Sequence, residues 1–280
     1  MKTDAVMSRR DFLQTAAIAS GTAWMALNFP LMARADEWGG FKMGIQSYSL
    51  RGFDVHKALE ASKKLGLTYW ESFKDHLPMT TVPGKIAEQK KMLADAGVKL
   101  MAYGVLEFTE NETQARANFD YAKAIGLESI SANPKKNEAT FKLLDKLVEE
   151  YQVNIAIHNH GPKATYDKID DVVNIIRDHH KRIGACVDTG HYLRSSESPV
   201  EALQRLKGRV YGVHLKDVKD TKKFTILGEG DLDVYGCLKE LKDQNYQHCL
   251  AIEYEEHPEN PVPDLEVSVQ NLKKALAKLG

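Results

Sequence analysis

Residues 183–191 read Ile-Gly-Ala-Cys-Val-Asp-Thr-Gly-His, and this stretch carries the pattern that decides the fold. A short apolar run is typical of a strand buried on both faces, and this run leads directly into Asp188 and His191. Two other runs have the same form, because Ile-Ala-Ile leads into His158 and Tyr-Gly-Val leads into His214. Buried strands that end in polar side chains predict a parallel sheet with a polar site at its carboxyl edge.

Five further segments complete a series of eight strand candidates, which alternate with segments of helical spacing. Leu144, Leu147 and Val148 recur at the spacing of one helix face, and Gly126 stands where a helix is expected to end. Eight strand-helix pairs predict a (β/α)8 TIM barrel over residues 41–280, a single domain near the usual size of about 250 residues. The strand candidates are Met43–Tyr48, Tyr69–Phe73, Leu100–Val105, Ser129–Ala132, Asn154–His158, Ile183–Asp188, Val210–Leu215 and Leu250–Tyr254.

A doubly wound open sheet is the alternative architecture. Such a sheet normally carries a glycine-rich phosphate loop after its first strand. Here the first strand leads into Tyr48-Ser49-Leu50-Arg51-Gly52, which lacks the G-x-G-x-x-G spacing. The barrel is therefore the predicted fold.

The composition excludes several classes of protein. Of the 280 residues, 43% are hydrophobic and 28% are charged, so the chain is expected to fold rather than stay disordered. A net charge of −1 gives no basic surface for nucleic acid. An odd number of cysteines without C-x-x-C spacing excludes a disulfide-built scaffold. Cys186, Cys237 and Cys249 are expected to be packed thiols, and a disulfide between two of them is left open.

The first 35 residues are typical of an export signal. Ser8-Arg9-Arg10-Asp11-Phe12-Leu13 resembles the twin-arginine motif, and Ala33-Arg34-Ala35 has the form of a cleavage site. Cleavage after Ala35 would leave 34 basic and 37 acidic residues, a net charge of −3. The predicted location is periplasmic or otherwise exported, with export machinery as the precursor's partner and no membrane contact after cleavage. Because Phe12–Met32 is long enough to span a bilayer, an uncleaved anchor is the alternative.

Histidine and carboxylate side chains gather at the predicted strand ends. His160 follows the fifth strand, Glu71 lies near the end of the second, and Glu253 lies in the eighth. Because the strands of a barrel end at one mouth, these residues are expected to converge there. Any one of them alone is explained by a helix cap or a hydrogen bond at the mouth, but burying them all unpaired would cost several kcal/mol. The joint pattern predicts one divalent ion, with Mn, Zn, Co or Fe favoured over Mg.

Four motifs carry a resemblance to a known family: Asp188-Thr189-Gly190-His191, His214-Leu215-Lys216-Asp217, Leu227-Gly228-Glu229-Gly230-Asp231 and Ile252-Glu253. In this order and spacing they resemble the xylose-isomerase-like barrel family, which lies within the sugar phosphate isomerase/epimerase and endonuclease-IV-like superfamily. The resemblance extends from about Phe41 to the C-terminus and implies one divalent metal at the ends of strands five to eight. By position, Asp188, His214 and Glu253 would be ligands. His158 would be the fourth, where many members have glutamate.

The histidine at position 158 bears on the reaction. Epimerases of the family resemble one another in placing two metal-bound glutamates on opposite faces of one carbon, and this chain has only Glu253 of that pair. The His158-Asn159-His160 triplet is similar to the inosose dehydratase branch, which eliminates water next to a carbonyl. The endonuclease branch carries further histidines and binds DNA. In this chain strands three and four end without histidine, and a net charge of −3 after signal cleavage disfavours DNA binding, so the endonuclease branch is not expected.

The implied activity is that of a metal-dependent sugar isomerase or epimerase that works through an enediolate, with a dehydratase, hydratase or lyase as the alternative. Glu253 is expected to act as ligand and base, His160 as acid or base, and Lys216 to polarise a substrate oxygen. Glu71 and His191 are expected to bind substrate hydroxyls. The competing interpretations are that Lys216 is a surface residue paired with the following aspartate and that Glu71 forms a salt bridge at the mouth.

The expected substrate is an unphosphorylated sugar, keto-sugar or cyclitol. The loops after the last two strands read Gly228-Glu229-Gly230-Asp231 and Glu255-Glu256-His257-Pro258. Barrels usually bind a substrate phosphate in these loops, and acidic side chains there would repel it. The one cationic cluster there, Lys219, Lys222 and Lys223, is otherwise a solvated loop. A sugar-binding barrel without catalysis and an interaction protein are the other classes, and a homo-oligomer is left open.

Overall fold

A computed structural model describes residues 37–279 of the chain. The predicted export signal at residues 1–35, its cleavage site and the alternative membrane anchor lie outside the described residues. Among residues 37–279, no helix is both long enough and apolar enough to cross a bilayer.

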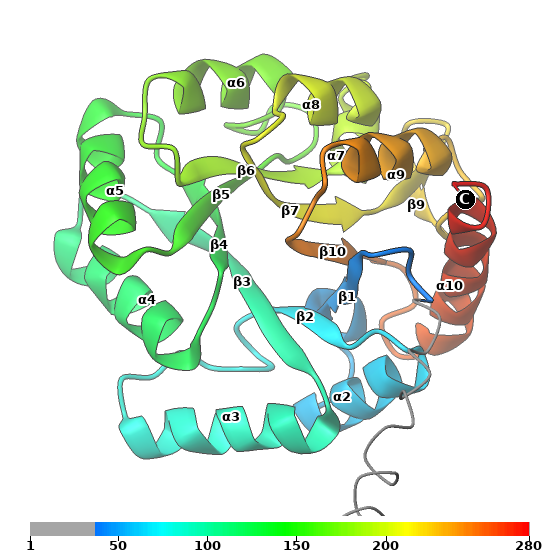
Figure 1. Cartoon of the computed structure of the whole chain (residues 1–280), viewed down its shortest axis with the longest axis horizontal. Helices are drawn as coiled ribbons and strands as arrows, with labels where there is room; N and C mark the ends of the chain where they lie inside the picture. The colour runs from blue at the N-terminus through cyan, green and yellow to red at the C-terminus, as the bar shows by residue number, and fades with distance from the viewer. Residues whose placement is uncertain (1–36, 280) are drawn as a thin grey trace, which may run out of the picture. The chain divides into compact units, whose positions relative to one another are not determined.

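Eight parallel strands close into a barrel, which confirms the predicted (β/α)8 fold (Figure 1). Their order around the barrel is β1-β10-β7-β6-β5-β4-β3-β2. The strand residues are largely buried, as expected for a parallel sheet covered by helices. The strands are β1 (Lys42–Gln46), β2 (Tyr69–Ser72), β3 (Lys99–Phe108), β4 (Ser129–Pro134), β5 (Asn154–His158), β6 (Ile183–Asp188), β7 (Val210–Leu215) and β10 (Cys249–Ile252).

The helices surround the barrel on its outside (Figure 1). Several begin at a side chain that accepts a free backbone N–H, as Asn137 does from Thr140 at the start of α5. Gly126 ends α4 at a φ of 95°, a conformation that favours glycine, so the predicted helix end is confirmed. The helices are η1 (Ser47–Leu50), α2 (Val55–Lys64), α3 (Pro83–Ala96), α4 (Glu112–Ile125), α5 (Glu138–Tyr151), α6 (Ile169–Arg177), α7 (Thr189–Arg194), α8 (Pro199–Arg205), α9 (Val234–Asp243) and α10 (Val262–Leu276).

The pairing register of the middle strands places polar residues side by side. His158 of β5 pairs with Cys186 of β6, and Asp188 of β6 pairs with His214 of β7. Cys186 and Asp188 are two residues apart on one strand, so their side chains lie on the same face of the sheet. The thiol therefore lies one layer deeper in the barrel than the carboxylate.

Several predicted strand boundaries differ from the structure by one to three residues, and two of these differences lie at the mouth of the barrel beside the polar cluster. β1 ends at Gln46, two residues early, because the Gln46 side chain accepts a hydrogen bond from the backbone N–H of Tyr48 and starts the short helix η1. β10 ends at Ile252, so Glu253 lies directly after the strand rather than within it.

A two-stranded hairpin that the sequence pattern does not predict follows β7. Its strands are β8 (Asp217–Lys219) and β9 (Lys223–Thr225). The Asp217 carboxylate accepts three hydrogen bonds of 2.8–3.0 Å from backbone N–H groups of the loop at 228–232, which ties this loop to the hairpin. The cationic cluster is exposed on the hairpin and consists of Lys219, Lys222 and Lys223.

All three cysteines are buried and free. Cys186 lies in β6, Cys237 in α9 and Cys249 at the start of β10. The disulfide that the sequence left open is therefore not formed in this structure.

Candidate metal centre

Four side chains form a cluster at the carboxyl mouth of the barrel. His158 ends β5, Asp188 ends β6, His214 is the penultimate residue of β7, and Glu253 follows β10. One donor atom of each lies within 4.8 Å of the other three, and no residue of the four is more than 8% exposed. The structure thus brings together the four residues that the sequence analysis predicts as metal ligands.

The distances within the cluster fit a first-row divalent ion. His158 Nε2 lies 3.1 Å from His214 Nδ1, and His214 Nδ1 lies 3.0 Å from Glu253 Oε2. Asp188 Oδ2 lies 3.5 Å from His158 Nε2 and 3.8 Å from His214 Nδ1. A tetrahedral ion with bonds of about 2.0–2.2 Å separates neighbouring donor atoms by about 3.3–3.6 Å. The four donors would therefore need only small shifts to hold such an ion.

Each of the two carboxylates in the cluster keeps one oxygen available to bind a metal ion. Asp188 Oδ2 and Glu253 Oε2 are buried without a well-formed hydrogen bond, although an ammonium group lies near both. Buried polar atoms of this kind are costly unless another group satisfies them. A divalent ion would satisfy both atoms, so the donor set fits a metal.

Asp188 has a second structural role. Its Oδ1 accepts a 2.8 Å hydrogen bond from the backbone N–H of His191 and caps α7. The Asn159 side chain bonds to both the N–H and the C=O of Asp188, at 2.8 and 2.9 Å. The sequence analysis missed this clamp, although Asn159 stands between the two histidines of the quoted triplet.

Glu71 lies on the side of His214 that faces away from the cluster, and it does not line the cavity described below. It is 1% exposed, and its Oε2 accepts a 2.9 Å hydrogen bond from His214 Nε2. Burial alone would raise the pKa of Glu71, but His214 holds this pKa below its ordinary value. Because Glu71 binds the Nε2 proton, Nδ1 of His214 is directed to the cluster. Glu71 thus makes an orienting contact with His214, in agreement with the competing interpretation of a salt bridge, and its contact with substrate hydroxyls stays a prediction.

Glu71→Gln is expected to weaken zinc binding by about 10- to 100-fold, because outer-shell carboxylates orient the histidines that bind metals. The dissociation constant would be measured by competition with a chromophoric chelator. Glu112→Gln, at an exposed position on α4, serves as the matched control. An unchanged dissociation constant in Glu71→Gln would show that this hydrogen bond does not orient His214.

Lys216 is buried in the cluster and is only 2% exposed. Its Nζ lies 2.9 Å from Asp188 Oδ2, 3.0 Å from Glu253 Oε2 and 2.6 Å from Glu255 Oε1. Burial alone would lower the pKa of Lys216, but these carboxylates raise it above its ordinary range. The competing interpretation of Lys216 as a surface residue is therefore wrong, since the carboxylate of Asp217 binds backbone N–H groups instead.

The Asp-Thr-Gly-His motif makes room for this lysine. The hydroxyl of Thr189 accepts a 2.9 Å hydrogen bond from the backbone N–H of Lys216. A Cβ atom at Gly190 would come within 2.6 Å of Lys216 Cγ. Glycine at position 190 therefore lets the lysine stem pass beneath α7.

A cavity of about 350 Å³ opens beside the cluster, which suits a small ligand. His158, Lys216 and Glu253 form part of its wall, together with the predicted residues His160 and His191. Burial lowers the pKa of His160 to about 4 and that of His191 to about 3. Both imidazoles are therefore neutral near pH 7.

The cavity wall also includes residues that were not predicted from the sequence, among them Arg194, Phe224 and Glu255. Arg194 follows His191 by three positions on α7, so helical spacing places both on one side of the helix. That spacing is a signal that could have identified Arg194. Phe224 belongs to the unpredicted hairpin, which explains why the sequence pattern did not reveal it.

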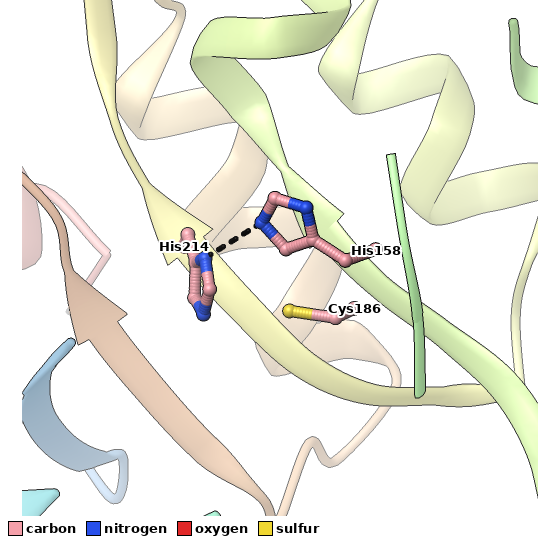
Figure 2. Close-up of side chains that lie close together, drawn as sticks. All are labelled: His158, Cys186 and His214. Atoms are coloured by element: carbon pink, nitrogen blue, oxygen red, sulfur yellow. Dashed lines mark hydrogen bonds between the residues drawn. The ribbon is translucent and has the colours of Figure 1, made fainter. Parts of the chain in front are cut away.

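A second donor group involves Cys186. Figure 2 shows His158, Cys186 and His214 together, and the Sγ atom lies within 4.8 Å of a nitrogen of each histidine. Burial raises the pKa of the Cys186 thiol above its ordinary value, which disfavours the thiolate that binds metals. The four-residue cluster offers one more donor and two carboxylates, so it is the better site for a divalent ion.

Comparison with known proteins places this site in context. Inosose dehydratase of Clostridium botulinum is 31% identical over 136 residues, which are 41% of this chain and 45% of that protein. The match thus spans less than half the length of this curated relative. Among solved structures, an uncharacterised protein of Parabacteroides distasonis is 26% identical with a TM-score of 0.67, and the match covers 84% of this chain and 99% of that one.

The fold also resembles that of 3-keto-D-glucoside 4-epimerase YcjR of E. coli. That protein has a TM-score of 0.65 at 15% identity, with coverage of 84% of this chain and 99% of the other. A family model described as the xylose isomerase-like TIM barrel matches residues 59–275. This match includes the four residues of the cluster, and the chain belongs to the xylose isomerase-like TIM barrel family.

Proposed function

We propose that this chain is a divalent-metal-dependent lyase that acts on a small keto-sugar or cyclitol. It would remove a proton from the carbon next to the carbonyl, and the hydroxyl on the following carbon would leave as water. The observation that carries this proposal is the identity of the groups on the cavity wall. Of the two cluster carboxylates, Glu253 lines the cavity, and a histidine rather than a second glutamate occupies position 158. The similarity to inosose dehydratases supports the same class of reaction.

Different residues of the site would bind the metal ion, remove the proton and assist the leaving hydroxyl. His158, Asp188, His214 and Glu253 would hold the ion, which when bound polarises the substrate carbonyl. Glu253 would accept the proton next to that carbonyl, and Lys216, 3.0 Å away, would keep this carboxylate ionised beforehand. His160 is a neutral imidazole on the same wall and would donate a hydrogen bond to the leaving hydroxyl, which would depart as water with the proton that Glu253 removed.

A sugar isomerase or epimerase is the second candidate function. Glu255 is a further carboxylate on the cavity wall, and its Oε1 lies 2.6 Å from Lys216 Nζ. A second carboxylate that could return a proton to the opposite face of the carbon would suit epimerisation.

The two candidates are separated by incubating the metal-loaded full chain with keto-cyclitols and keto-sugars in deuterated water. A lyase gives a product that has lost one water, which mass spectrometry detects, and Glu253→Gln is expected to abolish it. A product of unchanged composition that has exchanged a carbon-bound hydrogen for deuterium would instead establish the isomerase or epimerase. Turnover by protein stripped of metal with a chelator would contradict both candidates.

The proposal extends to the location of the enzyme. The twin-arginine-type segment at residues 1–35 supports export of the chain. The predicted unphosphorylated substrate agrees with a compartment outside the cytoplasm.

A further inference from the structure

The cavity wall carries two fixed cations, and their surroundings differ. Lys216 lies within 3.0 Å of Asp188, Glu253 and Glu255, so carboxylates of the protein already neutralise it. Arg194 has no carboxylate within 4.0 Å of its guanidinium among residues 37–279, although it lines the same cavity. A half-buried cation without a carboxylate partner predicts that the counter-charge arrives with the ligand.

Two neighbours hold the Arg194 guanidinium in place, and a third leaves room for it. Nη1 lies 3.3 Å from His191 Nδ1, and Cζ lies 5.1 Å from the centre of the Phe224 ring. A Cβ atom at Gly161 would come within 3.1 Å of Nη1, so glycine at that position leaves room for the group. The side chain is thus held by an imidazole and an aromatic ring rather than by a carboxylate, which leaves its charge available.

Arg194 is also fixed relative to the metal centre. It ends α7, the six-residue helix that Asp188 caps through Oδ1 while its Oδ2 faces the cluster. The helix therefore sets the spacing between a metal ligand and a cationic group on one cavity wall. A substrate held at both points would have its reacting carbons oriented between them.

We infer that Arg194 is a specificity-determining residue and that the substrate is a sugar acid, which carries a carboxylate that pairs with this guanidinium. This inference rests on the proposed function, because it takes the cavity to be the substrate site. A carboxylate matches the planar fork of one arginine. A dianionic phosphate fits less well, because Glu253 and Glu255 share the cavity wall and would repel it.

The test compares two probes that share a ring and differ only at the sixth carbon, D-glucuronate and D-glucose. Their affinities for zinc-loaded full-length protein would be measured by ligand-observed NMR. We expect glucuronate to bind about tenfold more tightly than glucose, and Arg194→Gln to remove this preference while glucose affinity stays within about twofold. Arg177→Gln, on the exposed face of α6, is the charge-matched control and should change neither affinity.

Three results would overturn the inference. One is equal affinity for the two probes. Another is a preference for glucuronate that survives in Arg194→Gln, which would mean that the glucuronate carboxylate binds the metal ion instead of Arg194. The third is tighter binding of glucose 6-phosphate than of glucuronate, which would assign the site to phosphate. Metal content and turnover of neutral keto-sugars are measured on the same samples. If they are normal while the preference is absent, this inference alone fails. If metal and turnover are absent while the preference persists, the proposed function fails instead.

Discussion

His214→Ala is expected to lower bound metal from about one equivalent per chain to less than about a tenth of that, and to abolish turnover. His214 Nδ1 is the centre of the cluster, since it lies 3.1 Å from His158 Nε2 and 3.0 Å from Glu253 Oε2. Without it, only one imidazole and two carboxylates remain. The measurement is elemental analysis by mass spectrometry after loading with mixed divalent metals and desalting.

Two control variants make this result specific. His56→Ala removes an exposed histidine on α2 and should leave the metal content unchanged. Cys186→Ser should also retain the metal, because the four-residue cluster does not include the thiol. Loss of metal in Cys186→Ser, together with retention in Asp188→Asn, would instead assign the ion to the deeper group that contains Cys186.

Lys216→Met is expected to lower the free energy of unfolding of the metal-free protein by about 3–5 kcal/mol, because it leaves buried carboxylates without a counter-charge. Asp188 and Glu253 lose a cation that lies within 3.0 Å of both. A bound divalent ion would neutralise the same two carboxylates, so the loss should be smaller in the presence of zinc. Urea unfolding followed by circular dichroism, with chelator and with zinc, measures both values.

Lys239→Met is the matched control for this prediction. Lys239 is exposed on α9 and pairs with Asp243, and removal of a surface pair of this kind should cost less than about 1 kcal/mol. A loss of stability in Lys216→Met that is equal with and without zinc would show that the lysine and the ion do not neutralise the same carboxylates.

The fold was accessible from local patterns in the sequence, and the four-residue cluster was accessible from those patterns together with the resemblance to the family. Short apolar runs mark buried strands, and the rule that barrel strands end at one mouth brings His158, Asp188 and His214 together. The cluster could be predicted even though it is drawn from four strands, since each residue lies within one position of the end of its own strand.

Contacts that depend on how far a side chain reaches across the barrel were not accessible. Glu71 and His214 are 143 residues apart, and only the three-dimensional structure shows that they are hydrogen-bonded. The sequence placed Lys216 at the mouth but could not show its burial, because lysine is rarely buried, whereas three carboxylates from two segments surround it. The hairpin was missed because its strands have only three residues each, too few to show periodicity.

The two oxygens of Asp188 have a consequence for protein engineering. Oδ2 faces the other three residues of the four-residue cluster, and Oδ1 caps the helix that carries His191 and Arg194. A longer glutamate at this position could still reach an ion, but it would give up the short-range cap and release the helix. Attempts to engineer the proposed metal site should therefore vary His158 and leave Asp188 intact, because a change at Asp188 would disturb the proposed metal site and the position of Arg194 together.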